Sequence, residues 1–229
     1  MSVLNLYIPG IENDLREFKV VQSVLGKEGI NNITNFYQEG RPKESFFKKA
    51  QKIEEGILER FLLQAGTSDI NIIAQDVGCT EAALILGNLG TFDSDRKEQI
   101  RSATLMSFQF SDVSEVDSLI ILNESERKYG KYDEYKKSLP LLDQILYNRR
   151  HLKLRESSYE MLDKTAVPYQ LVYSDGDIYV DQIYMKVFAK ITGKEMIVAE
   201  SNSHNPLIGT DKENVAQKIK ILIDNNKRR

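Results

Sequence analysis

The positions of hydrophobic and polar residues predict a chain in which short strands alternate with helices. Apolar runs of strand length lie at 3–9, 70–74, 102–110, 168–177 and 195–205, and the last two end in polar residues. Apolar residues at helical spacing fill the intervals, at 17–29, 43–66, 80–90, 180–194 and 212–227. A further strand is expected at 30–38, where asparagines weaken the pattern.

This alternation predicts an α/β protein with a mostly parallel central sheet that is flanked by helices on both faces. Residues 111–166 interrupt the alternation, because they are charged, rich in Glu, Lys and Tyr, and mostly helical in pattern. We therefore expect a core formed by 1–110 and 167–229, with a helical lid inserted at 111–166.

Composition narrows the function classes. The chain has 229 residues and a net charge of −3, which argues against nucleic-acid binding. Its N-terminus lacks signal-peptide features and no apolar run approaches the roughly 20 residues of a membrane helix, so we expect a cytoplasmic protein with no membrane partner. The single cysteine, Cys79, and the two histidines are too widely separated to predict a metal site, and no cofactor is expected.

Polar residues follow several of the predicted strands. Asp76 follows the strand that begins at Ile70, Asp175 and Asp177 stand at the end of a later strand, and His204 follows the last one. Right-handed crossovers bring the carboxyl ends of parallel strands to one edge of the sheet. Two carboxylates and a histidine are therefore expected to converge there.

The order of these residues resembles the α/β-hydrolase superfamily, in which a strand–turn–helix nucleophile elbow is followed by an acid and a histidine. The elbow pattern, usually G-x-S-x-G, reads "AQDVG" here, with Asp76 where serine normally stands. The stretch "VPYQLVYSDGDIYV" is similar to the strand that carries the acid and indicates Asp177, with Asp175 as the alternative. The stretch "AESNSHNPL" is similar to the strand that ends in the catalytic histidine and indicates His204.

The resemblance implies an enzyme in which the carboxylate of Asp76 attacks a saturated carbon and forms an ester with the substrate. His204 would then activate water to cleave that ester, and Asp177 would orient the imidazole. An elbow aspartate is the pattern of haloalkane and fluoroacetate dehalogenases and of epoxide hydrolases.

The loop that follows the first strand, "YIPGIEND", resembles the family's oxyanion loop. We therefore expect backbone amides near Gly10, Ile11 and Val77 to bind the developing oxyanion. Dehalogenases usually carry tryptophan where this chain has Val77, and the chain has no tryptophan, so carbon–halogen cleavage is disfavoured.

The sequence leaves two functions open. The first is hydrolysis of a small ester, epoxide or related small-molecule substrate by Asp76, Asp177 and His204. The second is an inactive protein that keeps the α/β-hydrolase fold as a binding module or scaffold, in which Asp76 caps the following helix. A homodimer is compatible with either function.

Overall fold

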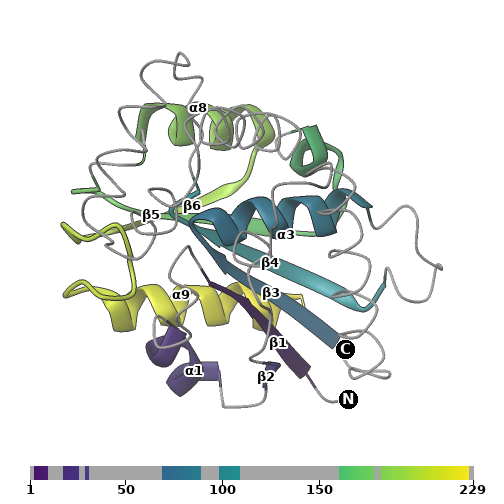
Figure 1. Cartoon of the computed structure of the whole chain (residues 1–229), viewed down its shortest axis with the longest axis horizontal. Helices are drawn as coiled ribbons and strands as arrows, with labels where there is room; N and C mark the ends of the chain where they lie inside the picture. Colours follow the sequence, from purple (N-terminus) through teal and green to yellow (C-terminus); the bar gives the residue numbers. More distant parts are fainter. Residues whose placement is uncertain are drawn as a thin grey trace, which may run out of the picture.

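The computed structural model of the chain describes residues 3–9, 18–25, 29–30, 69–88, 98–108, 160–177, 180 and 182–226. These ranges contain a six-stranded sheet in the order β2-β1-β3-β4-β5-β6, in which all neighbours run parallel (Figure 1). The strands are β1 (Val3–Ile8), β2 (Gly29–Ile30), β3 (Asp69–Gln75), β4 (Ile100–Met106), β5 (Tyr169–Ser174) and β6 (Glu195–Ala199). The predicted parallel α/β sheet is therefore confirmed.

Helices cover both faces of this sheet (Figure 1). The helices are α1 (Lys19–Leu25), α3 (Val77–Asn88), α8 (Gln182–Thr192) and α9 (Lys212–Asn225). Two hydrophobic cores result, one beneath α3 and α8 and the other beneath α1 and α9. Successive side chains of a strand point to opposite faces, so Leu6 and Ile8 join the α3/α8 core and Tyr7 joins the α1/α9 core. Burial on both faces explains why the strands read as nearly continuous apolar runs.

The order of the strands reverses beside β1. The chain passes from β1 to β2 at one edge of the sheet and then places β3 on the other side of β1. In open parallel sheets such a reversal leaves a crevice outside the carboxyl ends of the two flanking strands, where ligands bind. Pro9 follows β1 and Asp76 follows β3, so the predicted elbow lies at this position in the sheet.

Two predicted boundaries need correction. The helix predicted at 80–90 begins at Val77, because the chain enters it directly from the turn at Asp76. The strand predicted at 102–110 runs from Ile100 to Met106, because Ser107 has a positive φ of 53° that ends the extended conformation.

Part of the predicted organisation lies outside the described residues. This applies to the helix at 43–66, to 31–38 of the predicted strand and to 111–159 of the predicted lid. At the end of that insertion, residues 160–164 are helical and Leu162 is fully buried in the α3/α8 core. No helix within the described ranges is both long enough and apolar enough to cross a lipid bilayer.

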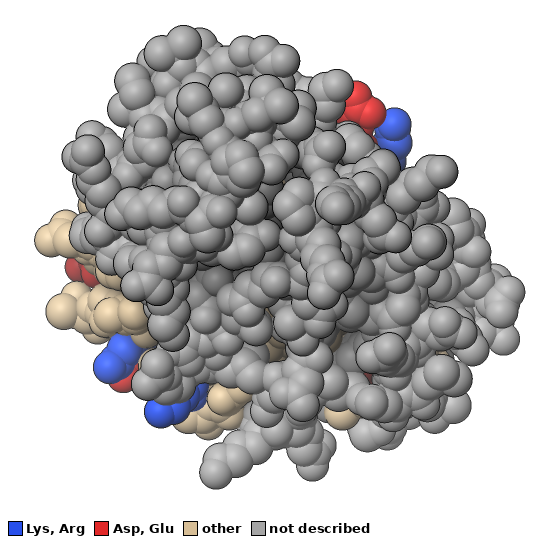
Figure 2. All heavy atoms as spheres, viewed as in Figure 1, with Lys and Arg blue, Asp and Glu red and all other residues tan. Residues whose placement is uncertain are grey.

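Charged side chains of both signs are interspersed on the described surface. Figure 2 shows basic and acidic groups close to one another at the margin of one face. On α9, Lys220 and Asp224 form an exposed ion pair one helical turn apart. Among the described residues visible in this view, neither sign of charge forms a large patch.

Candidate active site

The turn after β3 holds Asp76 in a left-handed backbone conformation, with a φ of 51°. Few residues other than glycine adopt this conformation, and aspartate is among those that tolerate it best. The N–H of Asp76 donates to the carbonyl of Met106 at 2.9 Å, and its own carbonyl accepts from the N–H of Cys79 at 3.0 Å. The chain therefore passes from β3 into α3 with Asp76 as the single residue at the bend.

The elbow also needs the glycine that follows two positions later. A Cβ at Gly78 would lie 2.5 Å from the carbonyl oxygen of Ile8 and 2.6 Å from that of Pro9. Both oxygens belong to the backbone, so neither can move aside without a shift of the chain at the end of β1. The absence of a side chain at Gly78 therefore lets β1 pass directly against the start of α3.

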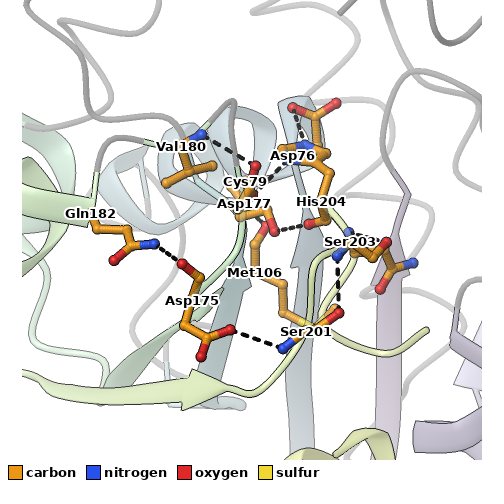
Figure 3. A network of polar contacts seen from close by, with 12 residues as sticks. Asp76, Cys79, Met106, Asp175, Asp177, Val180, Gln182, Ser201, Ser203 and His204 are labelled. Carbon is orange, nitrogen blue, oxygen red and sulfur yellow. Dashed lines mark hydrogen bonds and ion pairs between the residues drawn. The ribbon is translucent and has the colours of Figure 1, made fainter. Parts of the chain in front are cut away.

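The imidazole of His204 lies between two carboxylates (Figure 3). Its Nδ1 is 2.8 Å from Oδ2 of Asp177, and its Nε2 is 3.5 Å from Oδ1 of Asp76. Only 7% of the His204 side chain and 12% of the Asp76 side chain are exposed, and the Asp177 side chain is fully buried. The three side chains that the sequence predicted to converge at the carboxyl edge of the sheet therefore meet there.

The electrostatics of this arrangement favour a protonated histidine. Burial of the ring lowers the pKa of His204, but hydrogen bonds to Asp177 and Asp76, together with the negative charges of both carboxylates, outweigh burial. The net result raises the pKa of His204 from 6.5 to about 10. Near pH 7 the ring is therefore an imidazolium with one N–H directed toward each carboxylate.

The two aspartates in the turn after β5 make different contacts. Asp177 contacts the imidazole, and its Oδ1 also accepts from the N–H of Val180 at 3.4 Å. Asp175 accepts from the N–H of Ser201 through its Oδ1 at 3.0 Å and so holds the loop after β6 (Figure 3). Of the two alternatives, Asp177 is the one that lies against His204.

Ser107 also reaches the site, although its sequence context predicted only the continuation of a strand. Ser107 follows β4, is fully buried, and donates a hydrogen bond from its hydroxyl to the backbone carbonyl of His204. No pattern of residue types marks a serine in the left-handed conformation, so the sequence carries no signal for this contact.

The structure describes some of the other predicted site residues and not the rest. Val77 is the first residue of α3 and directly follows Asp76, whereas Gly10 and Ile11 lie outside the described residues. Cys79 is fully buried, and its thiol donates to the carbonyl of Met106 at 3.2 Å. Within the described part of the chain, no group of three or more His, Cys, Asp or Glu side chains is arranged to hold a metal ion.

A cavity of about 560 Å³ lies at the opposite end of the sheet. Its lining includes the end of α3 at Leu86, the start of β4 at Ile100 and Arg101, and the segment before β5 at Val167. The elbow stands at the carboxyl ends of the strands and this cavity at their amino ends, so the cavity is not part of the site.

The sheet order and the strand–turn–helix elbow are those of the α/β-hydrolase fold, and the chain has that fold. A lipase-esterase related protein from Clostridium acetobutylicum is similar with a TM-score of 0.63 at 14% identity, over 96% of this chain and 94% of that chain. A hydrolase from Oleispira antarctica is similar with a TM-score of 0.63 at 14% identity, over 99% of this chain and 92% of that chain. A loop variant of the haloalkane dehalogenase DbeA from Bradyrhizobium elkanii is similar with a TM-score of 0.60 at 15% identity, over 98% of this chain and 89% of that chain. No protein-family model and no curated protein matches the sequence.

Proposed function

We propose that this protein is a hydrolase that acts on a small substrate through a covalent ester on Asp76. The substrate class that we favour is an epoxide, whose ring Asp76 opens. The observation that carries the proposal is the position of the His204 ring, with Nε2 3.5 Å from Oδ1 of Asp76 and Nδ1 2.8 Å from Oδ2 of Asp177. A carboxylate is ionised near pH 7, so it attacks a saturated carbon without a base.

In the first step an Asp76 oxygen forms a bond to an epoxide carbon, and the carbon–oxygen bond of the ring breaks. The alkoxide that forms takes a proton from the His204 imidazolium, whose raised pKa keeps that proton available near neutrality. The products of this step are a hydroxyalkyl ester of Asp76 and a neutral imidazole.

In the second step the neutral imidazole removes a proton from water, which attacks the ester carbonyl of Asp76. Esterification has removed the negative charge of Asp76, one of the causes that raise the pKa of His204, so the ring is a base only after the first step. Collapse of the tetrahedral intermediate breaks the bond between the Asp76 carbonyl carbon and the substrate oxygen. That oxygen takes the second proton of the water, and the diol leaves. Asp76 returns as a carboxylate and His204 as an imidazolium.

The oxyanion of the second step needs hydrogen-bond donors beside Asp76. The N–H of Val77, at the first position of α3, is our candidate, and the amides near Gly10 and Ile11 complete the predicted set. Removal of one such donor costs about 3 kcal/mol in well-studied enzymes. We further propose that 111–166 forms the lid over this site.

Epoxide opening is favoured over carbon–halogen cleavage by the residue after the nucleophile. One structural neighbour is a haloalkane dehalogenase, but this chain has Val77 beside Asp76 and no tryptophan to bind a halide. The imidazolium supports the same choice, because an epoxide oxygen needs a proton as the ring opens and a halide ion does not.

The test is turnover of a panel of small epoxides, esters and haloacids by the parent, Asp76→Ala and His204→Gln, with Asp175→Asn as the matched control. We expect Asp76→Ala to be inactive. His204→Gln lacks both the proton donor of the first step and the base of the second, so we expect it to form the ester slowly, with water as the proton source, and to retain it. Mass spectrometry would then find the peptide that contains residue 76 heavier by the mass of the epoxide. Turnover that survives both substitutions would contradict this mechanism. No turnover of any panel member by the parent would contradict the proposal and favour the inactive binding or scaffold protein.

A further inference from the structure

Ser107 combines an unfavourable backbone conformation with a buried hydrogen bond. Its φ of 53° lies in the left-handed region, which is disfavoured for a residue with a Cβ. Residues in such conformations persist only where the surrounding structure holds them, and they are concentrated at functional sites. The hydrogen bonds of Ser107 therefore indicate which function its backbone conformation supports.

Two hydrogen bonds to other described residues hold Ser107. Its N–H donates to the carbonyl of Val172 at 2.8 Å, which extends the pairing of β4 with β5 by one residue. Its hydroxyl donates to the carbonyl of His204, in the loop after β6. The second contact joins the end of β4 to a segment that lies two strands away in the sheet.

The preceding residue makes the corresponding contacts with the elbow. The carbonyl of Met106 accepts from the N–H of Asp76 at 2.9 Å and from the thiol of Cys79 at 3.2 Å. Residues 106 and 107 are therefore bonded to the turn of the carboxylate on one side and to the backbone of the histidine on the other. Through these bonds the end of β4 connects Asp76 to His204.

We propose that Ser107 is a positioning residue, which holds the backbone of His204 so that Nε2 faces Asp76 while Nδ1 faces Asp177. The bonds to the two carboxylates orient the ring through its two nitrogens, but they do not fix its backbone, and a ring on a displaced backbone cannot keep both. Ser107 contacts no reacting atom, so its effect on catalysis rests on the proposed function. A displacement of about 1 Å at such a group costs on the order of 10²-fold in rate.

The test compares Ser107→Ala with Ser107→Gly in the full chain. Both substitutions remove the hydroxyl, but only alanine keeps the Cβ that the left-handed region disfavours, so Ser107→Gly is expected to melt at a higher temperature than Ser107→Ala. Loss of the hydroxyl is expected to change the position of the His204 ring equally in the two variants. Ser107→Cys, which keeps a side chain of similar size with a weaker donor, should restore part of the effect.

The first readout is the NMR titration of the His204 ring without substrate. The chain has two histidines, so His151→Gln in every variant leaves a single signal. We expect the apparent pKa of His204 to fall by about one unit or more in Ser107→Ala and Ser107→Gly, because the ring loses its alignment with Asp76 and Asp177. With an active substrate, kcat should fall by about 10- to 100-fold while KM changes little.

The two readouts separate this inference from the proposed function. If Ser107→Ala and Ser107→Gly fold and their His204 titration matches the parent, Ser107 serves packing alone and the inference is overturned. Should one of them fail to fold, the other and Ser107→Cys give the same comparison. The titration needs no turnover, so it decides the role of Ser107 even if the parent hydrolyses no substrate.

Discussion

Nε2 of His204 lies 3.5 Å from Oδ1 of Asp76, on the side of the imidazole opposite its 2.8 Å contact with Asp177. One buried cation therefore stands between two carboxylates, and the cluster carries one net negative charge near pH 7. The unfolded chain does not hold these groups together, so protonation of His204 is coupled to folding.

This coupling predicts that stability falls as the pH rises. The pKa of His204 is about 10 in the folded protein and near its usual 6.5 in the unfolded chain. A raised pKa contributes stability that is fully present below pH 6.5 and is lost as the pH rises through 10. The free energy of unfolding should therefore decrease between these values, by at most about 1.4 kcal/mol for each pH unit from this group.

The measurement is urea unfolding at several pH values for the parent and for His204→Gln. Other groups titrate in the same window, so the quantity of interest is the difference between the two proteins. That difference should shrink as the pH rises toward 10. A constant difference across the window would show that His204 is not held as an imidazolium.

Asp177→Asn and Asp175→Asn form a matched pair, because both aspartates lie in the turn after β5. Asp177 contacts Nδ1 of His204, whereas Asp175 accepts from the N–H of Ser201. We expect Asp177→Asn to lower the pKa of His204 and to lower kcat by up to about 10⁴-fold, the loss that the same substitution of the orienting acid produces in a well-studied enzyme. Asp175→Asn should leave both near the parent values, and the reverse result would assign the acid to Asp175.

The sequence predicted the convergence of Asp76, Asp177 and His204 because two strong rules apply to it. Buried parallel strands read as apolar runs, and the residues that follow such strands meet at one edge of the sheet. The position of each side chain thus follows from where a strand ends, which the residue pattern marks well at Asp76 and His204.

Ser107 could not be predicted in the same way. Its role depends on a backbone dihedral and on a contact with a carbonyl oxygen, and neither depends on a recognisable pattern of residue types. The start of α3 was misplaced for a related reason, because a single left-handed residue at Asp76 suffices to join strand to helix. The predicted lid and the helix at 43–66 fall mainly or wholly outside the described residues, so they stay predictions.

Gly78→Ala tests the close approach of β1 to the elbow. The added methyl group would meet the backbone oxygens of Ile8 and Pro9 at 2.5 and 2.6 Å, so β1 or α3 must shift. Such overpacking typically costs about 1–3 kcal/mol, and the displaced elbow should also lose turnover. Gly193→Ala is the control, because Gly193 has a positive φ of 64° but no atom within 4 Å of the added Cβ. It should lose about 1 kcal/mol from backbone strain alone and keep full turnover, as measured by urea unfolding and initial rates.

The thiol of Cys79 is expected to be unreactive in the folded protein, and alkylation of the native protein tests this directly. Burial, and then the charge of Asp76, raise the pKa of Cys79 well above its usual value, so the reactive thiolate is scarce at pH 8. We expect iodoacetamide to label the native protein far more slowly than the urea-unfolded chain, and intact mass reports this directly because Cys79 is the single cysteine. Burial is the larger cause, so Asp76→Ala should increase native labelling only slightly. Rapid labelling of the native parent would place the thiol in contact with solvent and contradict the packing of α3 against β4.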